Sequence, residues 1–295
     1  MAAVYINWKG LSTMSDSLNK RIDNYYNHGH FLYRFFWMNK KNLAVHFGFW
    51  DNKTKNLNDA LINENRIISE ELAIKKTDTV LDAGCGVGGS SIWIAENYGA
   101  KVTGITITRR QVELAKKYAI GRGVQDLVDF KLNDFCKTDF SSGSFDKIFA
   151  IESVCHAEDK ADFLSESYRL LKPGGRLVVS DGFLIKENLS KAESSYYKDL
   201  CDGWVLPNLA KLDEFRQHLV RLGYKNIEYK NMTNKILESS RDMNKSARYI
   251  LPIVGLLSKM KLISESNALA EKACIAQYNI FESKVGEYGM FIAEK

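Results

Sequence analysis

The chain has 295 residues, of which 45% are hydrophobic and 26% are charged, and its formal net charge is +5. This length allows one large domain with a sizeable core, or one domain with a lid. The mildly basic charge is not concentrated in a lysine or arginine block, so we expect no nucleic-acid partner. The longest apolar run, residues 250–257, is too short to span a bilayer, and the N-terminus lacks a secretory pattern.

Cysteine usage indicates the redox setting and argues against a metal. The five cysteines are Cys85, Cys136, Cys155, Cys201 and Cys274. They are odd in number and never occur in C-x-x-C spacing, which favours neither a disulfide framework nor a zinc site. We therefore expect a reducing, cytoplasmic location. His28 and His30 in "HGH" have no further ligand cluster nearby, so we expect no metal site.

The N-terminal part shows no alternation of strands and helices. Residues 1–14 are interpreted as an extension or tag, because Met14 offers an alternative start. Aromatic residues are dense over residues 15–50, and residues 57–75 have the apolar spacing of an amphipathic helix. We interpret residues 15–75 as a helical lid.

Residues 76–185 alternate between strand and helix patterns. The expected strands are 77–83, 100–106, 126–132, 144–151 and 175–183, and the expected helices are 88–99, 109–123 and 159–171. Such alternation is typical of a parallel sheet that is covered on both faces. Residues 186–283 then predict a mainly helical cap on the acceptor side, with one strand at 224–230, and residues 284–295 predict a closing strand. The fold class is therefore α/β, a Rossmann-like, doubly wound, seven-stranded sheet with a helical insertion before the last strand.

The stretch "VLDAGCGVGG" lies between the first strand and the helix that follows it. Gly84, Gly86 and Gly89 fit the pattern G-x-G-x-x-G, which lets a backbone turn tightly against a ligand. Asp82 lies two residues before the first glycine and would repel the pyrophosphate of a nicotinamide cofactor. A ligand with an ammonium or sulfonium group would be attracted instead, and S-adenosylmethionine carries both. A plain strand-to-helix turn is the alternative interpretation.

This stretch resembles motif I of the class I S-adenosylmethionine-dependent methyltransferases, and "LKPGGRLVVSD" resembles their later motif around the fifth strand. The resemblance covers about residues 40–230 and the last strand. "GITITRRQ" resembles an element of the branch that contains the tocopherol, sterol and cyclopropane-fatty-acid enzymes. In this element Thr106 stands where most class I enzymes carry an acidic residue for the ribose.

The resemblance implies S-adenosyl-L-methionine as the cofactor and a set of residues that bind it. These are Asp82, Gly84, Cys85, Gly86, Thr106, Ile107, Gln111, Asn133, Asp134, Phe135 and Ile151. Gln111 would hold the adenosine side, Asp134 would accept a hydrogen bond from the exocyclic amine, and Phe135 would offer its backbone N–H. The residues alone allow Gln111 to be a solvated helix residue and Asp134 a turn residue.

Candidate catalytic residues follow the fourth strand and lie in the N-terminal part. Glu152 and His156 in "AIESVCHAED" could act as a base or as the counter-charge to a cation, or could serve as a cofactor contact and a capping residue. "ESVCHA" resembles the E-x-x-x-H of sterol and tocopherol enzymes. "NLAVHFGFWD" resembles an element that folds over the cofactor in this branch. We therefore expect Tyr25, His46, Phe47 and Trp50 near the site, and count Tyr25 and His46 as catalytic candidates.

The predicted function is S-adenosylmethionine-dependent methyl transfer to carbon in a small, apolar, isoprenoid- or sterol-like acceptor. The branch resemblance, the apolar residues 250–257 and the aromatic N-terminus support this prediction. Residues 250–257 could also contact a membrane surface. The alternatives are N- or O-methylation of a small amine or phenol, a NAD-dependent oxidoreductase, and a cofactor-binding protein without turnover. The sequence does not decide the oligomeric state.

Overall fold

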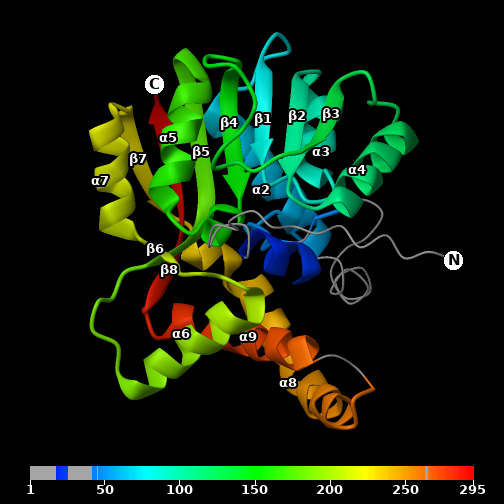
Figure 1. The fold of residues 1–295 in the computed structure, drawn as a ribbon, viewed down its shortest axis with the longest axis vertical. Helices are drawn as coiled ribbons and strands as arrows, with labels where there is room; N and C mark the ends of the chain where they lie inside the picture. Colours follow the sequence, from blue (N-terminus) through cyan, green and yellow to red (C-terminus); the bar gives the residue numbers. More distant parts are fainter. Residues whose placement is uncertain (1–17, 26–41, 45, 263–264) are drawn as a thin grey trace, which may run out of the picture.

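A computed structural model describes residues 18–25, 42–44, 46–262 and 265–295 of the chain (Figure 1). The interpretation of residues 1–14 and the expectations for His28 and His30 lie outside the described residues.

The centre of the molecule is a mixed β-sheet. Its strands are β1 (Thr79–Ala83), β2 (Lys101–Thr106), β3 (Val128–Leu132), β4 (Phe145–Ile151), β5 (Leu171–Leu184), β6 (Ala210–Lys211), β7 (Lys225–Asn231) and β8 (Gly286–Glu294). They follow the order β3-β2-β1-β4-β5-β8-β7, and β6 pairs with β5 beside this path. Only β8 runs antiparallel to its neighbours. The seven predicted strands form the main path, which confirms the predicted sheet, and the two-residue strand β6 is added beside it.

The strand order places a ligand site between β1 and β4. The chain leaves β1 toward β2 and β3 on one side, and returns to β4 and β5 on the other. At such a reversal the loops after neighbouring strands diverge, and ligands bind at the carboxyl ends of the strands. The loop after β1 contains Gly84, and the loop after β4 contains Glu152, so both predicted groups meet at this edge.

Helices cover both faces of the sheet. Contacts between helices place α2 (Leu57–Leu72), α3 (Gly89–Tyr98) and α4 (Arg109–Arg122) together, and α5 (Lys160–Leu170) with α7 (Leu212–Leu222). Successive strand residues point to opposite faces. Val80 and Val178 therefore pack in the core cluster under α3 and α4, whereas Leu81 and Val179 pack in the cluster under α5 and α7.

A third layer consists of α6 (Lys191–Trp204), α8 (Thr233–Lys259) and α9 (Glu265–Glu282). The helix α9 contacts both α6 and α8. Figure 1 shows that the arrows of β1 and β4 point toward this layer, so it faces the carboxyl ends of the strands. Its own small core includes Leu200, Ala273 and Ile280. No helix in the described part of the chain is long and apolar enough to cross a membrane.

Candidate active site

The glycine loop after β1 is a tight turn that only a glycine fits at its first position. Gly84 has a φ of +94°, and a Cβ built there would lie 2.3 Å from the Cβ of Ser153. The N–H groups of Gly84 and Cys85 both donate to the carbonyl of Ile105, at 3.0 and 2.9 Å. The loop is thereby tied to β2, and Gly84 is required by the fold as well as by any ligand.

Asp82 is a buried carboxylate at the end of β1. It is 3% exposed and accepts a hydrogen bond from the Ser91 hydroxyl at 2.6 Å. Burial raises the pKa of its carboxyl to about 7. Among the described residues, no lysine or arginine forms an ion pair with it, and its side chain lines a cavity. An anion that is desolvated without a cationic partner is costly, so the position fits the ammonium of an amino-acid ligand.

The cavity beside the glycine loop has a volume of about 150 Å³. The predicted residues that line it are Asp82, Gly84, Cys85, Gly86, Thr106, Ile107, Gln111, Asp134, Phe135, Ile151, Glu152, His156 and His46. Asn133 does not line it. Its side chain instead donates to Asp139 and accepts from the N–H of Asp134, so it shapes the turn, and its role in cofactor binding stays a prediction.

The polar groups at one end of this cavity suit a ribose. The Thr106 hydroxyl donates to Oε1 of Gln111 at 2.6 Å. Within the described residues the amide nitrogen of Gln111 has no protein partner, so it remains available as a donor. Thr106 thus orients Gln111 and stands where a carboxylate would otherwise bind the ribose directly.

A short N-terminal helix also lines the cavity. Residues 18–25 are helical, and Leu18, Asn19 and Ile22 line the cavity beside Asp134. The Asn19 amide donates to Oδ2 of Asp134 at 2.8 Å, and the N–H of Cys136 donates to Oδ1 at 2.8 Å. Asp134 is therefore held in place by the protein before any ligand binds.

Glu152 lies at the innermost point of the cavity in an unusual backbone conformation. Its φ is +46°, which is uncommon for a residue other than glycine and is often found at functional positions. Its Oε1 accepts from the N–H of Phe47 at 2.7 Å and from the Tyr288 hydroxyl at 2.9 Å. Burial and the nearby Glu64 raise the pKa of its carboxyl to about 8, despite the opposing effect of His46. Near neutral pH the group is therefore poised between its two protonation states.

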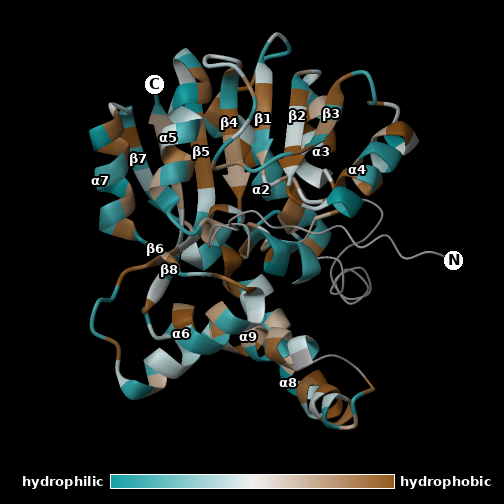
Figure 2. Ribbon diagram, viewed as in Figure 1, coloured by the Kyte–Doolittle hydropathy of each residue, from teal (hydrophilic) through white to brown (hydrophobic). Residues whose placement is uncertain are grey.

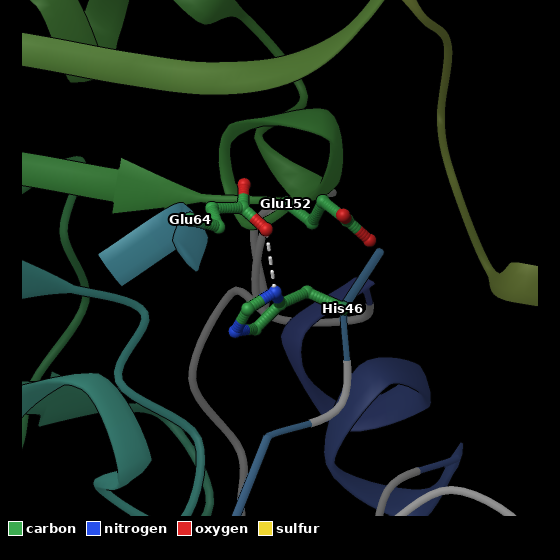
Figure 3. Close-up of side chains that lie close together, drawn as sticks. All are labelled: His46, Glu64 and Glu152. Carbon is green, nitrogen blue, oxygen red and sulfur yellow. Dashed lines mark hydrogen bonds and ion pairs between the residues drawn. The ribbon is translucent and has the colours of Figure 1, made fainter. Parts of the chain in front are cut away.

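His46 and Glu64 form a buried pair next to Glu152 (Figure 3). The Nδ1 atom of His46 lies 2.8 Å from Oε2 of Glu64, and Glu64 is fully buried. Burial alone would lower the pKa of His46, but the charge and hydrogen bond of Glu64 raise it to about 9. The ligand atoms of His46, Glu64 and Glu152 lie within 4.8 Å of one another, as in some metal sites. The direct bond between His46 and Glu64 accounts for the spacing of these two, and the hydrogen bonds from Phe47 and Tyr288 hold Glu152 beside them.

A second cavity of about 220 Å³ adjoins the first. His46, Glu152 and His156 line both cavities, so the two meet at these side chains. The second is mainly apolar, with lining residues that include Phe47, Leu200, Trp204, Met243, Ala247, Ile250, Ile280 and Phe281. Tyr25 lines it as well. Trp50 lines neither cavity and donates from its indole nitrogen to Ser239 at 2.8 Å, so its place near the site stays a prediction.

His156 differs from His46 in the pKa of its imidazole. It ends a short 3-10 turn, Val154–His156, after β4. Burial lowers the pKa of its imidazole to about 4, although a backbone hydrogen bond with Val205 opposes this effect. The junction of the two cavities therefore offers one neutral imidazole, one charged imidazole and one carboxyl group.

Sequence reasoning missed three side chains of the site: Glu64 and Tyr288 next to Glu152, and Asn19 beside Asp134. Glu64 lies on the inner face of α2, and an acidic residue among its apolar neighbours was the available signal. Tyr288 is 1% exposed in β8 and lies 3.2 Å from Glu64 through its hydroxyl. Asn19 belongs to a short helix far from the glycine motif, where no sequence pattern indicated a contact.

The comparisons with known proteins agree with this geometry. A family model described as a methyltransferase domain matches residues 81–179. Methyltransferase GfsG of Streptomyces halstedii is 27% identical over 82% of this chain and 86% of that protein. Sterol 24-C-methyltransferase of Saccharomyces cerevisiae is 31% identical over 74% of this chain and 58% of that protein. Norajmaline N-methyltransferase of Rauvolfia serpentina is 29% identical over 64% of this chain and 70% of that protein.

Three solved structures share the fold at low sequence identity. The cyclopropane synthase MmaA2 of Mycobacterium tuberculosis has a TM-score of 0.80 at 15% identity, covering 94% of this chain and 98% of that one. The [4+2]-cyclase SpnF has a TM-score of 0.76 at 20% identity, covering 94% and 96%. Geranyl diphosphate C-methyltransferase of Streptomyces coelicolor A3(2) has a TM-score of 0.72 at 19% identity, covering 94% and 97%.

The fold, the glycine loop and the matched domain together define the class. The chain contains a methyltransferase domain of the class I, S-adenosylmethionine-dependent type, with S-adenosyl-L-methionine as its cofactor. The buried anion Asp82 and the free amide of Gln111 fit the ammonium and ribose of that cofactor. The nicotinamide-dependent alternative finds no support in any of these comparisons.

Proposed function

We propose that the protein transfers a methyl group to carbon in a small, apolar, isoprenoid- or sterol-like acceptor. The observation that carries the proposal is the junction of the two cavities at His46, Glu152 and His156. One cavity presents the groups that suit the cofactor, and the other is apolar and large enough for a hydrocarbon acceptor. A group at the junction can therefore touch both the methyl donor and the atom that receives it.

The residues at the junction suit methylation of an alkene. When bound, the cofactor would supply a methyl group on a sulfonium; an electron-rich carbon would attack that methyl group in line, and the sulfur would leave as the thioether of S-adenosylhomocysteine. The product of that addition is a carbocation, which must lose a proton or be stabilised. Glu152 in its ionised form can take that proton, and the ring faces of Phe47 and Trp204 can stabilise the charge. The apolar walls exclude water that would otherwise capture the cation.

Methylation of nitrogen or oxygen is the second candidate, because Glu152 could equally accept a proton from an amine or a hydroxyl. Norajmaline N-methyltransferase, by its name, methylates nitrogen, which favours this candidate.

The test is mass spectrometry of products formed from labelled S-adenosylmethionine with a cell lipid extract and, separately, with an amine and phenol panel. Label on a terpenoid or sterol carbon supports the proposal. Label on nitrogen or oxygen alone replaces it with the second candidate.

We further propose that α8 contacts an anionic membrane surface. Tyr249, Ile253, Leu256 and Met260 are 82%, 62%, 60% and 59% exposed and recur at helical spacing along one stripe. In Figure 2 the apolar segments of α8 lie at the end of the molecule farthest from the sheet. Neighbouring residues of the same helix, among them Ala247 and Ile250, line the acceptor cavity. The helix α8 carries five basic and two acidic residues, which complements anionic lipid.

Sedimentation with phosphatidylserine-containing vesicles tests this contact. We expect Ile253→Asp with Leu256→Asp to lower the bound fraction several-fold. The control is Val220→Asp, which charges an apolar side chain that is 61% exposed on α7. Equal binding of the double variant and the control would contradict the membrane contact.

A further inference from the structure

One face of α9 forms a wall along the length of the acceptor cavity. The residues of this helix that line the cavity are Ser266, Asn267, Ala270, Glu271, Cys274, Gln277, Ile280 and Phe281. Phe281 marks the inner end, because its ring lies 6.1 Å from that of Phe47, whose N–H donates to Glu152. Glu271 lies ten residues earlier in the helix, which corresponds to about 15 Å along its axis.

Glu271 is the acidic side chain of this cavity that the protein leaves without a partner. Glu152 accepts two hydrogen bonds, and Asp181 accepts from the N–H groups of Cys155 and Gly182 at 2.9 and 2.8 Å. For Glu271, which is half-buried, there is neither a hydrogen bond nor an ion pair within the described residues. Burial alone raises the pKa of its carboxyl.

The charges of the other residues that line this cavity bear on the role of Glu271. None of the described residues that line the cavity is a lysine or an arginine. A carboxyl group that is partly desolvated without a donor costs free energy, and a ligand that supplies the donor regains it. The same carboxyl group repels an anion, so it discriminates between acceptors that have similar hydrocarbon parts.

We infer that Glu271 binds a hydrogen-bond donor at the far end of the acceptor, either a hydroxyl or an ammonium group, about 15 Å along the helix axis from the inner end of the cavity at Phe281. The inference rests on the proposed function and narrows the substrate class. The acceptor is an apolar chain or ring system with one neutral or cationic polar end, and it is not a prenyl diphosphate. The helix α9 thus sets the distance between the polar end of the acceptor and its reacting carbon.

Binding of four probes with one hydrocarbon skeleton tests the inference. The probes are farnesylamine, farnesol, farnesene and farnesyl diphosphate, added to the full chain with saturating S-adenosylhomocysteine. Trp204 lines the cavity, so its fluorescence reports binding without turnover, and calorimetry gives a second measurement. We expect the amine and the alcohol to bind about tenfold more tightly than farnesene, and the diphosphate to bind most weakly.

Two variants test whether the Glu271 side chain causes the tighter binding of the amine and the alcohol. Glu271→Ala is expected to remove the advantage of the amine and the alcohol and to leave farnesene binding within twofold. Glu271→Gln is expected to keep part of the advantage of the alcohol and to lose that of the amine. Glu282→Ala, an exposed position on the same helix, serves as the matched control.

The outcomes separate this inference from the proposed function. If Glu271→Ala binds the amine and the alcohol as tightly as the unmodified chain does, the inference fails while the apolar cavity stands. Tightest binding of the diphosphate would also overturn it. If none of the four probes binds, the apolar acceptor fails and the inference fails with it.

Discussion

The cofactor cavity and the acceptor cavity lie side by side, but the chain builds them in different ways. Most residues of the cofactor cavity lie between Asp82 and Glu158, in loops that follow neighbouring parallel strands. Residues of the acceptor cavity are spread from Tyr25 to Tyr288 and come largely from α6, α8 and α9. One site therefore depends on local backbone geometry, and the other depends on how separate helices pack.

The two cavities, which form the cofactor half and the acceptor half of the site, therefore differ in how far their residues can change during evolution. Gly84 cannot carry a side chain without a clash with Ser153, so the cofactor loop tolerates little variation. Most of the acceptor wall consists of apolar side chains, which exchange at modest cost when total volume is kept. Relatives whose names indicate methylation of carbon or nitrogen can thus share the first half and differ in the second.

The largest effect is expected at Glu152, which belongs to both cavities. We expect Glu152→Gln to lower kcat by about 10²–10⁴-fold, because the amide cannot take a proton and carries no charge. Affinity for S-adenosylhomocysteine should stay within about twofold, since the amide oxygen can still accept from Phe47. Steady-state kinetics and calorimetry measure the two quantities, with Glu113→Gln, an exposed residue, as the control. Unchanged kcat would remove Glu152 from the chemistry.

A substitution of Asp82 should affect only the binding of the cofactor. Asp82→Asn keeps the shape of the side chain and removes its charge, so we expect affinity for S-adenosylhomocysteine to fall by about 10–100-fold. The melting temperature should not fall, because burial of the anion is itself unfavourable. Calorimetry and thermal denaturation measure both. A folded Asp82→Asn protein with full cofactor affinity would refute the position assigned to the ammonium.

Trp204 should affect only the acceptor half. Its ring lies 6.3 Å from that of Phe47 and lines the apolar cavity. We expect Trp204→Ala to raise KM for an apolar acceptor by about tenfold, as a large buried contact is lost. Cofactor affinity should stay unchanged. A loss of cofactor affinity of equal size would show that the two halves are not separable in this way.

The same contrast explains how much could be predicted from sequence. The parallel strands and the glycine loop were predicted because their signals are local, and the structure contains each of them. Asn133 and Trp50 line neither cavity, because adjacency in a motif does not fix the direction of a side chain. Glu64 and Tyr288 were not identified, since they meet Glu152 only after α2 and β8 pack against the sheet.

The smallest expected effect is a pH dependence that belongs to the cofactor half. The pKa of Asp82 is raised to about 7, so the ionised fraction rises from about a tenth at pH 6 to about nine-tenths at pH 8. The ammonium of S-adenosylhomocysteine binds the ionised form, so affinity should increase several-fold across this range. Calorimetry at pH 6, 7 and 8 measures the slope. Asp82→Asn should abolish it, whereas Glu152→Gln should keep it, because Glu152 faces the reacting atoms and titrates near pH 8. A slope that survives in Asp82→Asn would assign the titration to another group and would weaken the electrostatic account of the cofactor site.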